Sequence, residues 1–139
     1  MNGLDEMPNP KKKRRFAFAH EYKTLQEIAM DENLANLGDA YTNLLYSLYI
    51  SQKKNMPRGA KASSLILSRA LRRVGLRKFM PSRMDRHKQG DAVEALLVYV
   101  WLLGLTTITE DVRTLAKHDD VVEAFSFLLI GAKKKLDSF

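Results

Sequence analysis

The segment from Asp91 to Leu103 constrains the fold most, because nearly every position after its first turn is apolar. Residues at helical spacing along it are Ala92, Leu96, Val100 and Leu103. The density of apolar residues from Ala95 onward predicts a helix surrounded by protein on nearly all sides. The run from Ala95 to Leu105 is only about half the ~20 residues that a membrane-spanning helix needs. We therefore expect the central helix of a soluble bundle.

Further helical patterns surround this segment. Short helices are predicted over residues 21–30 and from residue 109, and a last long one begins at Asp119 or Asp120. A helix that ends near residues 53–58 is predicted to turn one stripe to the core: Leu34, Leu37, Tyr41, Leu44, Leu45 and Leu48. Another is expected over residues 60–74 with Gly75 as its cap, and residues 77–89 are interpreted as a basic loop. No strand pattern or repeat is present, so the predicted fold class is all-α, a helical bundle.

Composition bounds the organisation of the chain. Its 139 residues suit one domain, and the absence of cysteine excludes disulfides and thiolate metal sites. Residues 1–18 are interpreted as a flexible basic arm and residues 19–139 as the folded domain. No signal-peptide core is apparent at the N-terminus, so we expect a cytoplasmic protein with no membrane partner.

Positive charge is concentrated in one quarter of the chain. The formal net charge is +7, and twelve of the 23 Lys and Arg residues lie between Lys53 and Lys88, where Asp85 is the single acid. Such a stretch suits a polyanion, and nucleic acid is the commonest one in cells. The alternatives are a solvated helix face or, more weakly, an anionic membrane surface.

Three carboxylates stand where acids are unexpected. Asp91 and Glu94 are three residues apart and so share a face of the central helix, and Asp39 follows Gly38 in the helix before it. An unpaired buried carboxylate costs several kcal/mol, so Glu94 needs a cation or a basic partner. Glycine within a helix suggests close approach by another backbone or a ligand.

Carboxylates on two packed helices are typical ligands of Mg²⁺ or Mn²⁺, and such a site supports phosphodiester hydrolysis. Spacing alone leaves an alternative open. Asp91 could be satisfied by the helix dipole, while Asp39 and Glu94 pair with arginines of a neighbouring helix.

Two motifs carry a resemblance to a known family. Residues 32–40, ENLANLGDA, resemble the ribonuclease III signature ERLEFLGDA, and residues 91–96, DAVEAL, resemble its second motif, Asp-x-x-Glu-Ala-Leu. Each motif is short, but their order and their spacing of about fifty residues also match. The resemblance covers residues 20–136, the nuclease domain alone, and is greatest to the short Mini-III class that lacks a double-stranded RNA-binding domain.

The resemblance implies an all-helical homodimer that cleaves double-stranded or structured RNA with Mg²⁺, which Mn²⁺ can replace. It implies that Asp39, Asp91 and Glu94 are the catalytic and metal-binding residues. Glu32 matches an acid that lies near the dimer interface in the family, although an exposed acid at a helix start explains it equally well. The short class suggests a ribosomal RNA precursor as substrate.

The sequence also departs from the signature. Ala35 stands where the larger enzymes have a second glutamate, and Asn36 replaces a phenylalanine. Asn33, Asn36 and Asn43 flank Asp39 by helical turns, and an Asn carbonyl can bind a metal or its water, so Asn36 and Asn43 are candidates for a supporting role. The missing acid keeps open a noncatalytic RNA-binding or ribosome-associated protein of the same fold.

Basic residues before Asp91 are the predicted RNA contacts, since an A-form duplex is recognised mainly through phosphates and 2′-hydroxyls. They are Arg77, Lys78, Arg83, Arg86, His87 and Lys88. His20 and His118 have no partner at metal-ligand spacing and are interpreted as structural. The aromatic residues Tyr46, Tyr49, Tyr99 and Trp101 are expected in the core or at a dimer interface. A helical DNA-binding protein is a weaker alternative, because no recognition helix can be assigned.

Overall fold

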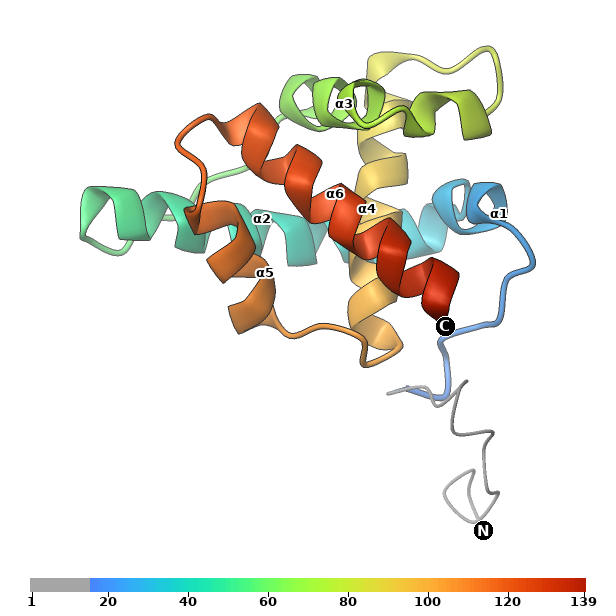
Figure 1. Cartoon of the computed structure of the whole chain (residues 1–139), viewed down its shortest axis with the longest axis horizontal. Helices are drawn as coiled ribbons and strands as arrows, with labels where there is room; N and C mark the ends of the chain where they lie inside the picture. The colour runs from blue at the N-terminus through green and yellow to red at the C-terminus, as the bar shows by residue number, and fades with distance from the viewer. Residues whose placement is uncertain (1–15) are drawn as a thin grey trace, which may run out of the picture.

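The computed structural model describes residues 16–139, and over that range it is all-α, as predicted (Figure 1). The elements are α1 (Leu25–Ala29), α2 (Glu32–Lys54), α3 (Ser64–Arg73), the 3₁₀ turn η2 (Leu76–Phe79), α4 (Arg86–Leu102), α5 (Ile108–Ala116) and α6 (Val121–Ser138). Residues 1–15 of the expected N-terminal arm lie outside the described residues. Phe16, where the description begins, already contacts the ring of Trp101, with ring centroids 5.5 Å apart.

Helix α4 is the centre of the bundle, as its apolar sequence predicts. It contacts α1, α2, α3 and α6, and Figure 1 shows α2 running behind it, α3 across one end and α6 diagonally in front. From Ala92 to Val100 every residue of α4 is buried, including Glu94. No helix within residues 16–139 is long and apolar enough to cross a membrane.

The predicted core stripe of α2 is only half right. Leu34, Tyr41 and Leu45 are buried, but the other three leucines remain on the surface. Their exposed fractions are 41% for Leu37, 44% for Leu44 and 36% for Leu48. The physical reason is that α2 turns Gly38 toward α4, which places these leucines about a quarter turn away, on a neighbouring face.

Several helix boundaries differ from the predicted ones because capping side chains determine them. Helix α4 begins at Arg86, inside the expected basic loop, because the Asp85 carboxylate accepts a hydrogen bond from Lys88 N at 2.8 Å. Ser63 similarly starts α3 later than expected, by accepting from Ile66 N at 3.2 Å. At the other end of α3, Gly75 adopts the left-handed conformation with φ 77°, as its predicted capping position requires.

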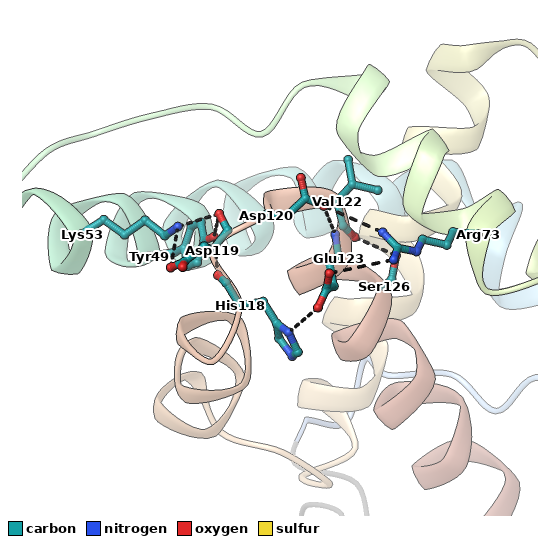
Figure 2. Close-up of polar contacts among 9 residues, drawn as sticks. All are labelled: Tyr49, Lys53, Arg73, His118, Asp119, Asp120, Val122, Glu123 and Ser126. Atoms are coloured by element: carbon teal, nitrogen blue, oxygen red, sulfur yellow. Dashed lines mark hydrogen bonds and ion pairs between the residues drawn. The ribbon is translucent and has the colours of Figure 1, made fainter.

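The turn between α5 and α6 is tied to α2 and α3 (Figure 2). Tyr49 of α2 is buried, and its hydroxyl donates to the His118 and Asp119 carbonyls at 2.7 and 3.1 Å. The ammonium of Lys53 also donates to the Asp119 carbonyl, at 2.6 Å, and Arg73 of α3 lies 3.8 Å from the Asp120 carboxylate. Through these contacts Tyr49 and the His118 backbone have a structural role: they hold this turn against α2.

The remaining aromatic residues also pack into the bundle. Tyr99 is buried, and its hydroxyl donates to the His20 carbonyl at 2.6 Å, while Tyr46 and Trp101 are half-buried against the core. Asp111, an acid in the first turn of α5, is buried and accepts 2.6 Å hydrogen bonds from Tyr41 and Thr106. Burial raises the pKa of Asp111, and these two hydrogen bonds oppose the rise.

Candidate active site

The candidate site forms where α2 crosses α4, and Gly38 makes the crossing close. A Cβ atom at Gly38 would lie 2.1 Å from the carbonyl oxygen of Glu94 and 2.5 Å from its carbonyl carbon. No larger residue fits without moving one of the two backbones, so the close approach inferred from the sequence is present. It places Asp39, the next residue of α2, beside Glu94.

Glu94 and Asp39 form a carboxyl pair. The Glu94 side chain is buried, with its residue 6% exposed, while Asp39 is half-buried. The pKa of Glu94 is raised to about 8. Burial is the largest cause, and a hydrogen bond with Asp39 and the negative charges of Asp39 and Asp91 add to it. The contact with Asp39 thus favours the protonated form of Glu94, whose carboxyl can donate to the Asp39 carboxylate.

Asp91 completes the predicted trio from the second turn of α4. It is exposed, and partial burial raises its pKa, with further increases from the charges of Asp39 and Asp85. Lys88 and His87 act in the opposite direction. The alternative that Asp91 lies at the start of the helix and is satisfied by its dipole is wrong, because Asp85 is the capping residue and α4 begins at Arg86.

No ion pair neutralises these acids. Among residues 16–139, no Lys, Arg or His nitrogen lies within salt-bridge distance of Asp39, Asp91 or Glu94. The pairing with neighbouring arginines, which the sequence left open, is therefore not found in this part of the chain. The site keeps an excess of negative charge next to a buried carboxyl.

The carboxylates of Asp39, Asp91 and Glu94 are chemically suited to bind a hard divalent cation. Carboxylate oxygens are the ligands that Mg²⁺ and Mn²⁺ prefer, and Mg²⁺ commonly uses one or two carboxylates and keeps several waters. The side chains are not gathered as a ready ligand cluster, since within residues 16–139 no group of three His, Cys, Asp or Glu is placed to hold a metal. The negative charges of Asp39 and Asp91 help to raise the pKa of Glu94, as neighbouring carboxylates do.

Asn43 supports the pair from the next turn of α2. Its amide nitrogen donates to Asp39 Oδ1 at 3.3 Å, and its amide oxygen accepts from Ala62 N at 3.0 Å. Asn43 thus links Asp39 to the segment before α3, whereas Asn36 is exposed. Glu32 is also exposed, at the start of α2, and its carboxylate lies 3.6 Å from the Lys88 ammonium.

The predicted RNA contacts divide into two groups. The guanidinium of Arg77 donates to the Pro81 and Ser82 carbonyls at 2.7 and 2.9 Å, so this side chain braces its own loop. The others are exposed on the surface before and within the first turn of α4. These exposed residues are Lys78, Arg83, Arg86, His87 and Lys88.

The sequence interpretation missed Lys61. This exposed residue precedes α3, and its positive charge lowers the pKa of Glu94, opposing the effects of burial and of the neighbouring acids. Lys61 belongs to the basic stretch noted in the sequence. Nothing in the linear pattern indicates, however, that residues 58–62 run back along α2 to the acids.

Comparison with known proteins places the chain beside a family of nucleases. The family model described as Ribonuclease III matches residues 32–133, which include both helices of the carboxylate site. No curated protein sequence matches the chain.

Proposed function

The chain belongs to the ribonuclease III family, and on this premise we propose that it is a divalent-metal-dependent endoribonuclease acting on double-stranded or structured RNA. The family match supports an RNA-cleaving nuclease in general terms. The observation that carries the more specific proposal is the buried Glu94–Asp39 pair, whose charge no basic side chain of residues 16–139 neutralises. A ribosomal RNA precursor is the substrate that the short class suggests.

In this proposal Asp39 and Glu94 hold the cation, and Asp91 lies beside them on the same face of α4. Bound Mg²⁺, or Mn²⁺ in its place, would supply an activated water and would neutralise charge on the phosphate. Asn43 would keep the Asp39 carboxylate oriented through its 3.3 Å hydrogen bond. Burial of Glu94 would exclude bulk water from one side of the site.

The protein's basic residues would position the duplex. Arg86, His87 and Lys88 are exposed on the first turn of α4, within two turns of Asp91. Contacts to phosphates on either side of the cleaved bond suit these side chains, because they need no base-specific geometry.

The proposal is tested with a labelled duplex RNA, purified protein and Mg²⁺, with products resolved on a denaturing gel. We expect Glu94→Gln to reduce the cleavage rate by about 10²-fold or more, because the carboxylate that holds the cation is lost. Glu21→Gln is the matched control, since Glu21 is exposed and the charge change is the same. Undiminished cleavage by Glu94→Gln would show that the site is misassigned.

A noncatalytic RNA-binding protein is the second candidate. Ala35 removes one acid of the family signature, and the three carboxylates are not gathered as a metal cluster. This candidate predicts salt-sensitive duplex binding with no cleavage in either Mg²⁺ or Mn²⁺. Mn²⁺-dependent cleavage that Glu94→Gln abolishes would exclude it.

A further inference from the structure

Residues 58–62, which we name the strap, lie along α2 and are held by one side chain from each of three successive helical turns. The pairs are Ser51 with Arg58, Ser47 with Ala60, and Asn43 with Ala62. Each serine hydroxyl both donates to the carbonyl and accepts from the N–H of the same strap residue, over 2.9–3.1 Å. The strap therefore has a fixed register on the helix although it has no secondary structure of its own.

The register follows from matching repeats. Four helical residues advance about 6.0 Å, and two extended residues advance about 6.6 Å, so every second strap residue meets a helix residue one turn further on. In an extended chain, the backbone groups of alternate residues point to opposite edges. Residues 58, 60 and 62 direct their backbone groups to α2. The same alternation directs the backbone groups of Gly59 and Lys61 away from α2.

The outer edge of the strap is free. The N–H groups of Gly59 and Lys61 have no hydrogen-bond partner among residues 16–139, and a Cβ added at Gly59 would meet nothing within 4 Å. Lys61 is exposed and makes no ion pair with the described residues. Two N–H groups without a partner among residues 16–139 thus belong to neighbouring exposed residues, one of them a lysine, a combination that suits phosphate oxygens.

The strap ends at the carboxylate pair. Ala62 N donates a hydrogen bond to Asn43, and Asn43 donates one to Asp39. The residue next to Lys61 is therefore linked to the site by hydrogen bonds. The effect of the Lys61 charge on Glu94 agrees with this placement. Lys61 forms no ion pair with these acids, so its ammonium can bind an anion beside them.

We propose that the strap is a phosphate-binding element of the RNA site, in which the Lys61 ammonium and the outward N–H groups contact the strand at the Asp39–Glu94 pair. This inference rests on the proposed function. Asn43, Ser47 and Ser51 are then positioning residues, since they set the place of Lys61 without touching the RNA.

Binding of a fluorescent RNA duplex, measured by anisotropy in EDTA over a range of salt concentrations, tests the proposal without any cleavage. We expect Lys61→Ala to weaken binding about 3- to 10-fold and to reduce the slope of log affinity against log salt by about one, as the loss of one phosphate contact requires. Lys61→Arg should retain most of the binding affinity and most of the salt slope. Lys54→Ala is the matched control, because exposed Lys54 lies 15 residues beyond Asp39, or about 22 Å along α2.

Unchanged affinity and salt slope in Lys61→Ala, or an equal loss in Lys54→Ala, would overturn the proposal. A cycle with Ser47→Ala tests positioning: once the strap is loosened, Lys61→Ala should cost less than it does in the wild-type protein. Equal costs in both backgrounds would remove the positioning role. If the wild-type protein binds the duplex but does not cleave it in Mg²⁺ or Mn²⁺, the proposed function fails, while the binding result for Lys61 still decides this inference.

Discussion

At the scale of the residue, Glu94 combines two properties that rarely occur together. It is an acid inside the most apolar helix, and its nearest ionisable partners are also acids. Burial and like charge both favour its protonated form, so the folded protein holds a proton on Glu94 more tightly than the unfolded chain does. Folding at neutral pH is therefore linked to that proton.

This linkage predicts how stability depends on pH. The pKa of Glu94 is about 8 in the folded protein against an ordinary value of 4.5, so the stability that its proton contributes is fully present below pH 4.5 and is lost as pH rises through 8. In EDTA, the free energy of unfolding should fall over this interval by at most about 1.4 kcal/mol per pH unit. Chemical denaturation of wild-type protein and Glu94→Gln at several pH values measures it, and the variant should show a smaller fall. Parallel pH profiles would contradict the raised pKa.

The residues of the site differ in how far the sequence predicts them. Asp39 and Glu94 can be predicted because a carboxylate in an apolar helix is costly and helical spacing fixes its face. Lys61 cannot, because its position depends on side-chain hydrogen bonds from Ser47 and Asn43 to a segment without periodicity. Arg77 is predicted as an RNA contact from its charge and its position before Asp91, but its guanidinium braces the Pro81–Ser82 backbone.

At the scale of the element, the crossing of α2 and α4 depends on one missing side chain. We expect Gly38→Ala to destabilise the fold by about 1–3 kcal/mol or more, since the new Cβ would collide with the Glu94 carbonyl and separate the helices. Gly131→Ala in α6 is the matched control, because a Cβ there meets nothing within 4 Å. That control should gain up to about 1 kcal/mol from helix propensity. Thermal unfolding followed by circular dichroism compares them, and equal stability of the two variants would contradict the close crossing.

Element types were predictable and element ends were less so. The apolar repeat of α4 predicted both its helical structure and its central place, because a helix that is apolar all round must be surrounded. The helix begins five residues before the start that this repeat predicts, because Asp85, within a basic segment, is its capping residue. The predicted core face of α2 includes three leucines that are in fact exposed. Helical spacing groups the leucines on one side of the helix, but it does not say which of them α4 will cover.

At the scale of the whole molecule, the leucines that α2 leaves exposed lie along one side of the helix. Leu37, Leu44 and Leu48 recur at seven and four residues, and each is at least 36% exposed. A row of this kind is the geometry by which one helix packs against another. The family resemblance implies a homodimer, and a second copy of this chain is the occupant that we expect on this face.

Sedimentation equilibrium or light scattering at micromolar concentration tests this expectation, with about twice the 15.9 kDa chain mass as the expected result. Leu44→Glu should shift the protein toward the monomer, because a carboxylate buried in an apolar interface loses its hydration without gaining a partner. Leu65→Glu is the control, since Leu65 lies on α3 and is similarly exposed, at 40% against 44% for Leu44. Both side chains are outside the core, so circular dichroism should find both variants folded. A dimer that survives Leu44→Glu but dissociates with Leu65→Glu would place the interface on α3, and a monomeric wild-type protein would contradict the dimer itself.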